Sequence, residues 1–273
     1  MEREASNVKR QTWRRRLGQY GPPLVLLLAL LALWEVLVRL AGVPKWLLPA
    51  PTQIVAAGLS AAPLLGPHIA QTMQETLLGL GLALVAGLLL AFAIDLSATL
   101  RRALYPLLVA SQTIPILALA PLLIIWFGYG ILPKVLVVAL VCFFPVAVGM
   151  ADGLRAADPE LINLLRAMGA SRRQIFAKVR LPAALPSFFS GLKIAVTYSV
   201  VGAIIGEWVG ASVGLGIFMT RSSKSFLTDR VFAAIAITSL LSIALFAVVL
   251  VLERAVLPWY FAGREEVWEE IGD

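Results

Sequence analysis

The chain has 273 residues, of which 60% are hydrophobic and 14% are charged, and its mean hydropathy is +0.88. Soluble domains carry about 45–50% apolar and about 25% charged residues, so this composition excludes an ordinary soluble protein and favours one that spans a membrane. The net charge of +7 then reflects orientation in the membrane and not nucleic-acid binding, and the single cysteine, Cys142, excludes an intrachain disulfide.

The chain begins with a basic segment, residues 1–21, which contains the run MEREASNVKRQTWRRR. An apolar stretch follows it over residues 22–41. A secretory signal peptide also begins with basic residues, but its apolar region is about 7–15 residues long and ends at a cleavage site of small residues. The stretch here is longer and carries Glu35 and Arg39 near its far end. We therefore expect an uncleaved first membrane helix.

Six apolar segments are long enough to cross a bilayer, which takes about 20 residues of helix. They are Leu24–Leu40, Leu77–Leu96, Leu104–Phe127, Val135–Met150, Phe188–Val209 and Phe232–Leu252. The third contains Pro106, Pro115 and Pro121, so we expect a short helix at the membrane edge followed by a broken span, because each proline removes a backbone hydrogen bond. Small residues at every fourth position of the second, from Gly79 to Gly87, predict close packing against a neighbouring helix.

Lysine and arginine are concentrated in alternate connections between these segments. With the N-terminus in the cytoplasm, the cytoplasmic side holds Arg101, Arg102 and the basic residues of a loop over residues 155–186, and the outer side holds fewer. Because positive residues favour the cytoplasmic side, we expect a multi-pass protein of the cell (inner) membrane with both termini in the cytoplasm.

The loop over residues 155–186 has the signals of two short helices. The run DPE at 158–160 is typical of a helix start, and Gly169 suits a left-handed C-terminal cap. Ser171 and Gln174 form a capping-box pattern for a second helix, which we expect to stop before Pro182.

Both helices carry an apolar face. In the first helix it is formed by Leu161, Leu164, Leu165 and Met168, and in the second by Ile175, Phe176 and Val179. These faces can pack under the protein's own spanning helices or in the lipid interface. The alternative is that they fill a groove on a cytoplasmic partner. Periodicity alone favours packing on the protein's own helices or in the lipid interface.

Glu207 lies in the fifth segment, at the end that is distant from this loop and close to a membrane interface. A carboxylate there is explained by contact with a substrate or gate, or by a structural or solvated role. We take Glu207, Trp208, Gly210 and Ser212 as candidates for the substrate path or gate. His68 falls in an expected outer loop and is given no role.

Residues 163–182 resemble a known motif. Integral membrane subunits of ABC importers carry a cytoplasmic loop of the form E-A-A, three residues, G, nine residues, I-x-L-P. Here Gly169 is followed after nine residues by VRLP at 179–182, whereas NLL at 163–165 occupies the E-A-A positions, so Asn163 replaces the acid.

The resemblance covers roughly residues 70–260. The runs TLLGLGLALVAGLLLAFAI, LYPLLVASQTIPILALAPLLIIWFGYG and GAIIGEWVGASVGLGIFM are similar to core segments of the importer subfamily for sulfonates, taurine, nitrate and pyrimidine precursors. The run GEWVGASVGLG, with TDRVFAAI after it, most resembles permeases for hydroxymethylpyrimidine, the thiamine precursor.

This resemblance implies the all-α fold of a type I ABC importer permease, with a core over residues 70–260, one extra N-terminal helix and a cytoplasmic tail over residues 261–273. It implies a subunit that moves a small organic solute, with a pyrimidine or thiamine precursor as the best expectation and sulfonate, taurine or nitrate as the alternative. The implied partners are a second permease copy in a homodimer, two cytoplasmic ATPase subunits, an extracytoplasmic solute-binding protein and the lipid bilayer, with no nucleic acid.

The loop is then the coupling helix that docks on the ATPase. The resemblance assigns it Asn163, Leu164, Leu165, Met168, Gly169, Ala170, Ser171, Phe176, Val179, Leu181 and Pro182. The chain has no G-x-x-x-x-G-K-[ST] run, so we expect it to bind no nucleotide itself and to be no enzyme, with ATP and Mg²⁺ used by the partner ATPase. We expect no catalytic residue, no metal site and no cofactor in this chain.

A stand-alone secondary transporter or channel is the remote alternative. Ion-coupled carriers place ionisable groups near the bilayer midplane, whereas those of this chain fall near the ends of the predicted helices. A membrane enzyme would need a cluster of catalytic or metal-binding side chains, and one histidine and one cysteine far apart in sequence do not supply it.

Overall fold

The computed structural model describes residues 2–261, with side chains described from residue 21 onward. This part of the chain is helical and contains no strand. Its contacts divide it into two units, one of residues 2–63 with 222–233 and the other of residues 64–221 with 234–261. The second unit holds every candidate site residue. All but the first residue of the expected tail over 261–273 lies outside the described residues.

The first unit contains α1 (Glu2–Leu40), the beginnings of α2 (Pro51–Leu96) and α10 (Thr228–Val256), and the end of α9 (Leu215–Lys224) from Ser222 onward. Glu35, near the end of α1, accepts a 3.0 Å hydrogen bond from the backbone N–H of Thr52, in the first turn of α2. A carboxylate satisfies the unpaired amides of a helix start, which explains an acidic residue at this place in an apolar helix.

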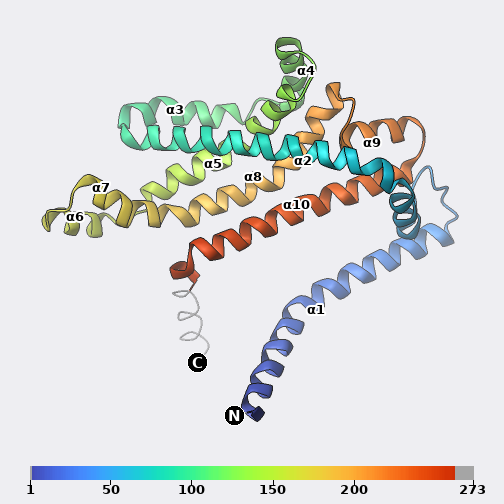
Figure 1. Cartoon of the computed structure of the whole chain (residues 1–273), viewed down its shortest axis with the longest axis horizontal. Helices are drawn as coiled ribbons and strands as arrows, with labels where there is room; N and C mark the ends of the chain where they lie inside the picture. The colour runs from blue at the N-terminus through green and yellow to red at the C-terminus, as the bar shows by residue number, and fades with distance from the viewer. Residues whose placement is uncertain (1, 262–273) are drawn as a thin grey trace. The chain divides into compact units, whose positions relative to one another are not determined.

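The second unit is built from the rest of α2 and α10 and from the helices between them (Figure 1). These are α3 (Ala98–Ser111), α4 (Ile116–Phe127), α5 (Leu132–Arg155), α6 (Pro159–Ala167), α7 (Arg172–Ile175), a π-helical segment η1 (Phe176–Arg180), α8 (Leu181–Gly210) and α9 (Leu215–Lys224). Among the described residues, five helices are long and apolar enough to cross a membrane, or six if the bent pair α3 and α4 counts as one span.

Helices α5 and α8 pack along one another, and α2 lies against them. The core between the three combines small and β-branched residues such as Ala83, Val138 and Ala195 with larger ones such as Leu80 and Phe189. Close approach is required at α2, because a Cβ added to Gly87 would lie 2.9 Å from Cγ1 of Val146 on α5. The predicted packing role of the small residues of α2 is therefore confirmed.

The third expected span differs in detail from the prediction. It is two helices, α3 and α4, bent by 100° at residues 112–115. Only Pro115 breaks the helix, and it does so as the extended N-cap residue of α4, with φ −65° and ψ 113°. Pro106 and Pro121 lie inside helices, where each only removes a donor.

The placement of His68 in an outer loop is wrong. Helix α2 is continuous from Pro51 and has 46 residues, so His68 lies within it and not in a connection. The stretch was missed because Pro63, Gly66 and Pro67 are typical of turns. In the second unit, the imidazole of His68 lies 5.4 Å from the ring of Phe218 on α9.

Candidate functional site

The short helices of the loop form as their sequence predicts. Asp158 caps α6 by accepting a 2.8 Å hydrogen bond from the backbone N–H of Glu160. Gly169 ends the turn after α6 with φ +82°, a left-handed conformation that favours glycine. Ser171 and Gln174 form the predicted capping box, with hydrogen bonds of 3.3 and 2.7 Å. The turn between α6 and α7 is thus specified locally.

The predicted stop of the second helix before Pro182 is wrong. Helix α7 continues through η1 directly into α8, where Pro182 lies in the first turn. A proline inside a regular α-helix clashes with the carbonyl group four residues earlier and lacks an amide to bond to it. The wider π turn over Phe176–Arg180 precedes this proline, so the chain passes into α8 without a break.

The two apolar faces of the loop have different surroundings. Met168 is 74% exposed and Leu164 57%, so the face of α6 is not covered by the described chain. By contrast, Ile175 is buried, and the ring of Phe176 lies 6.1 Å from that of Phe92 on α2. The first helix therefore offers a surface to something outside this chain, and the second is packed on the protein's own core.

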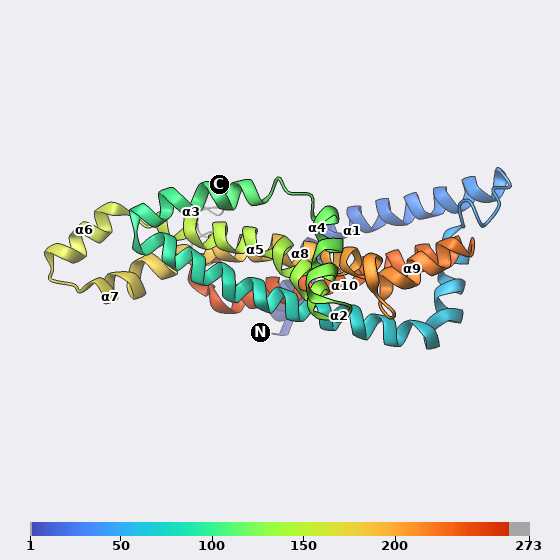
Figure 2. The same cartoon turned by 90° about the horizontal axis from the view of Figure 1, so that it is seen from above.

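The remaining predicted loop residues surround the same turn. Asn163 and Ser171 are exposed, and half-buried positions are held by Leu165, Ala170, Val179, Leu181 and Pro182. Figures 1 and 2 both place α6 and α7 together at one end of the second unit. The structure thus brings the loop residues together, and their docking on an ATPase stays a prediction.

The base of the loop is fixed by one ion pair. The guanidinium of Arg180, at the end of η1, donates hydrogen bonds of 2.9 and 2.6 Å to the two carboxylate oxygens of Asp95 on α2. It also donates to the backbone carbonyl of Leu154 on α5, at 3.1 Å. Two parallel charge-assisted hydrogen bonds hold orientation as well as position. Arg180 thus joins the loop to α2 and α5.

A cavity of about 1040 Å³ opens between α5, α8 and the break between α3 and α4. Its lining comprises Ser111, Gln112, Ile114, Pro115, Ile116, Leu119, Leu140, Val141, Phe143, Phe144, Pro145, Val148, Gly149, Asp152, Pro186, Ser187, Ser190, Gly191, Ile194, Tyr198 and Tyr260. Irregular backbone at membrane depth is tolerated where it lines a cavity or is buried in protein, and the break at residues 112–115 lies on this cavity.

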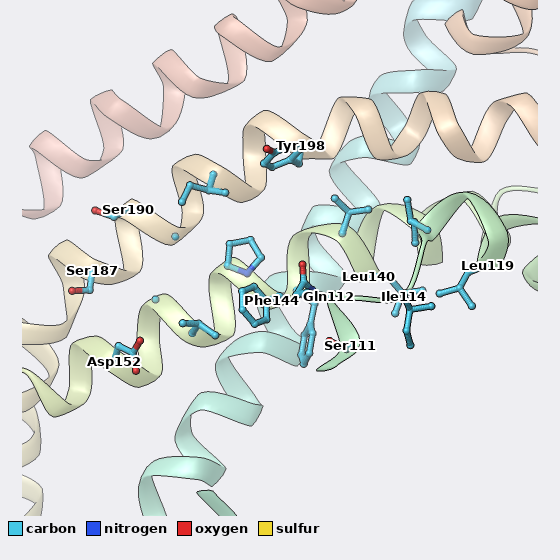
Figure 3. A pocket seen from close by; sticks show the side chains of 18 of the residues that line it. Ser111, Gln112, Ile114, Leu119, Leu140, Phe144, Asp152, Ser187, Ser190 and Tyr198 are labelled. Atoms are coloured by element: carbon cyan, nitrogen blue, oxygen red, sulfur yellow. The ribbon is translucent and has the colours of Figure 1, made fainter. Parts of the chain in front are cut away.

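The cavity has a polar end and an aromatic middle (Figure 3). Asp152 of α5 and Ser187 of α8 lie at one end, and Gln112, Phe144 and Tyr198 lie further along. Among the described residues of the lining, Asp152 is the sole carboxylate, and neither lysine nor arginine is present. Such a lining can stack on a flat ring and exchange hydrogen bonds with its substituents.

Glu207 lies at the end of α8 that is distant from the loop. It is buried, and its hydrogen-bond partners are buried too. Its carboxylate accepts a 2.6 Å hydrogen bond from Thr72 of α2 and another from the backbone N–H of Gly216, in the first turn of α9. Thr72 in turn accepts a 2.9 Å bond from the N–H of Leu215. The unpaired amides at the start of α9 are satisfied in this way by a carboxylate and a hydroxyl.

A buried ion pair lies one turn further along α2. The ammonium group of Lys134 on α5 is 3.1 Å from Oε1 of Glu75, and the two side chains are 8% and 0% exposed. Gln71 donates a 2.7 Å hydrogen bond to the same oxygen. The pairing of Lys134 with Glu75 is not apparent from the sequence, because the two residues lie far apart in it. No metal site is indicated, because no three of the described histidine, cysteine, aspartate and glutamate residues come together.

The four candidate path residues lie apart from the large cavity. Glu207 is buried, Trp208 and Ser212 are exposed, and Gly210 is half-buried beside Ile124 and Tyr129. Their contact with a substrate or gate stays a prediction. The cavity residues themselves were missed, although the prolines around residue 115 pointed to the broken helix that lines it.

Gly214→Ala is expected to destabilise the protein by about 1–3 kcal/mol. Gly214 has φ +137°, and a Cβ there would overlap the carboxylate of Glu207. The thermal midpoint of the purified protein measures the loss. Gly66→Ala is the matched control, because its added Cβ meets no atom within 4 Å, and equal midpoints for the two variants would contradict the assignment.

Comparison with known proteins agrees with this geometry. Residues 83–258 match the family model described as binding-protein-dependent transport system inner membrane component. The chain is 44% identical, over 90% of its length and 98% of the relative's, to the formylaminopyrimidine transport permease protein ThiX of Halalkalibacterium halodurans. It is 32% identical to the taurine transport system permease protein TauC of Escherichia coli, over 94% and 96% of the two chains.

The fold is also that of a solved importer. An inward-facing structure of the MetNI methionine ABC transporter matches with a TM-score of 0.58 at 21% identity, covering 70% of this chain and 96% of the solved one. The family match spans well over half of the chain, and the relatives align along nearly all of it. The chain is therefore a member of the family of inner membrane components of binding-protein-dependent transport systems, the permease subunits of ABC importers.

Proposed function

We propose that this permease moves a small substituted pyrimidine, a thiamine precursor, from an extracytoplasmic binding protein into the cytoplasm. The observation that carries the proposal is the 44% identity, over almost the full length of both chains, to a permease named for formylaminopyrimidine. The relatives named for taurine and aliphatic sulfonates are each 32% identical.

The lining of the large cavity supports the same choice. Sulfonates and nitrate are anions, and sites for such groups usually present arginine, lysine or convergent amides. Within the part of the chain that the structure describes, this lining contributes Asp152 and neither lysine nor arginine. A carboxylate accepts hydrogen bonds, as amino groups on a heterocycle require, and Phe144 and Tyr198 offer faces for the ring. Sulfonate, taurine and nitrate remain the second candidates because their permeases are relatives.

The extent of the cavity supports a route for the solute along α5 and α8. On the face of α8 it is lined from Pro186 to Tyr198, and on α5 from Leu140 to Asp152. At a rise of about 1.5 Å per residue, each stretch extends about 18 Å. That length is more than half of the roughly 30 Å thickness of a bilayer's hydrocarbon core. In the proposed orientation Asp152 lies toward the cytoplasm, so the solute would leave past the polar end.

The proposed assembly has two copies of this chain, two cytoplasmic ATPase subunits and one binding protein, with both termini of this chain in the cytoplasm. ATP and Mg²⁺ belong to the ATPase subunits. The exposed face of α6, with Leu164 and Met168, supports a docking site for an ATPase groove. Because α7 continues into α8, movement of the loop would be transmitted to the helix that lines the cavity.

The test is uptake by the reconstituted importer. Proteoliposomes containing this chain and its ATPase are given the binding protein, external substrate and internal ATP. We expect accumulation of formylaminopyrimidine that depends on ATP and on the binding protein, and little accumulation of taurine or nitrate. Preferential uptake of taurine, sulfonate or nitrate would overturn the substrate, and uptake without ATP would overturn the importer.

Phe144→Leu is expected to raise the KM for uptake about threefold to tenfold, because the substitution keeps an apolar side chain but removes an aromatic face. The measurement is the concentration dependence of uptake in the same vesicles. Phe246→Leu on α10 is the matched control, since Phe246 is outside the lining. An unchanged KM for Phe144→Leu would contradict stacking at this position.

A further inference from the structure

A second cavity, of about 1030 Å³, lies where α2 ends beside the loop. Arg166, Arg172 and Arg173 line it from the loop, and Phe92, Leu96 and Phe176 are among its apolar residues. With Arg180 and Asp95, which also line it, the cavity has a formal surplus of three positive charges.

No acidic residue among the side chains of residues 21–261 neutralises this positive charge. Asp95 is the only acidic residue among the described residues of the lining, and both of its oxygens accept hydrogen bonds from Arg180. Among the side chains of residues 21–261, neither Arg172 nor Arg173 has an ion-pair partner, and Arg166 contacts only the amide oxygen of Asn163, at 3.4 Å. Three guanidinium groups around one hollow are suited to an anion that bears several oxygens.

The apolar wall of the cavity continues along α2. Leu78, Leu82, Val85, Leu89 and Leu96 are exposed by 50, 41, 60, 65 and 87% respectively. Their spacing of three, four or seven residues places them on one face of the helix, which ends at the cavity. This stripe extends about 27 Å at 1.5 Å per residue, long enough to accompany an acyl chain through one leaflet.

We propose that this cavity binds an anionic phospholipid. Its phosphate lies among Arg166, Arg172 and Arg173, and its acyl chain lies along the exposed stripe of α2. An acidic surface of a protein partner would satisfy the arginines but would leave the apolar stripe unexplained, so the combination favours a lipid. The inference rests on the proposed cytoplasmic position of the loop, where basic residues meet anionic headgroups, and not on the identity of the solute.

The position of the lipid gives it a role in coupling. Phe176 packs on Phe92, and Arg180 joins η1 to α2, so both walls of the cavity belong to the joint between the loop and the spanning helices. A phosphate bound there would neutralise like charges on either side of the turn after α6. The lipid would therefore hold α7 against α2.

Native mass spectrometry of the full-length protein in detergent tests the proposal. The probes are phosphatidylglycerol and phosphatidylcholine with identical acyl chains. We expect the wild type to retain phosphatidylglycerol preferentially, and each of Arg166→Gln, Arg172→Gln and Arg173→Gln to weaken that binding about fivefold. Arg155→Gln is the matched control, because Arg155 is an exposed loop arginine that does not line the cavity, and it is expected to leave the preference unchanged.

Three results would overturn the proposal. The first is equal retention of the two lipids by the wild type. The second is displacement of phosphatidylglycerol by millimolar inorganic phosphate alone, which would make the ligand a soluble phosphate. The third is a set of arginine variants that keep the lipid preference but no longer assemble with the ATPase, which would assign the cavity to that interface. None of these measurements depends on uptake, so they are separate from the test of substrate.

Discussion

Glu75→Leu is expected to destabilise the protein by about 3–5 kcal/mol, the largest loss for any single substitution considered for this chain. The substitution leaves the ammonium group of Lys134 buried, with a side chain only 8% exposed and without its carboxylate. It also removes the acceptor of Gln71. A loss of that size lowers the thermal midpoint of the purified protein by about 6–20 °C.

The double variant Glu75→Leu with Lys134→Met shows whether the single variant loses stability because Lys134 lacks its charge partner or because the side chain at position 75 has a different shape. Replacing both members of a buried pair with apolar residues is often neutral or stabilising, so we expect the midpoint to return close to that of the wild type. Arg39→Leu is the control, since its pair with Glu35 has side chains 64% and 19% exposed, and such pairs contribute about 0–1 kcal/mol. A single variant as stable as the wild type would show that the pair does not hold α2 to α5.

Gly169→Val is expected to lower ATP-dependent uptake about tenfold, within the usual range of coupling free energies of 1–3 kcal/mol. Gly169 has φ +82°, which a β-branched residue resists, and a Cβ there meets no atom within 4 Å. The effect therefore arises from the backbone of the turn and not from a clash. Uptake and substrate-stimulated ATP hydrolysis in the reconstituted importer are the measurements.

Two controls make the test of Gly169 specific. Gly169→Asn is expected to retain most uptake, because asparagine tolerates the left-handed conformation. Gly42→Val introduces the same kind of strain at φ +61°, also with no atom within 4 Å, in the first unit of the chain. If Gly169→Val and Gly42→Val lowered uptake equally, the loss would reflect strain in general and the loop would have no special role.

The features that the sequence predicted well are those set by neighbouring residues. Asp158 caps α6, Ser171 and Gln174 form their box, and Gly169 takes positive φ, because each of these depends on atoms within four residues. The apolar segments were also found, since a bilayer imposes length and composition on each helix separately. The family was predicted from the spacing of Gly169 and the Leu-Pro pair in the loop, and from the similarity of three core segments to those of importer permeases.

The features that were missed depend on residues distant in sequence. Nothing near His68 shows that its ring lies beside Phe218, and prolines around it are typical of a loop rather than a long helix. The ion pair of Glu75 with Lys134 and the bonds of Glu207 to Thr72 join residues more than fifty positions apart. For Glu207 the sequence left both a substrate or gate contact and a structural role open, because its hydrogen-bond partner Thr72 is distant in sequence.

The cavity was missed for a related reason. Its lining comes mainly from α3, α4, α5 and α8, with Tyr260 after α10, and most of its side chains are ordinary in a membrane helix. Only the break at Pro115 and the carboxylate of Asp152 were visible as irregularities along the sequence.

The π turn between the loop and α8 sets the direction in which the loop faces. Residues 172–210 form one helical rod of 39 residues, and each residue of a regular α-helix advances the chain by about 100°. A π turn holds one residue more than an α turn, so removing one residue from Phe176–Arg180 would rotate α6 by about a quarter of a circle about the axis of α8. One additional residue in the π turn therefore sets the rotational orientation of α6 about the axis of α8, and with it the direction that α6 faces relative to the cavity.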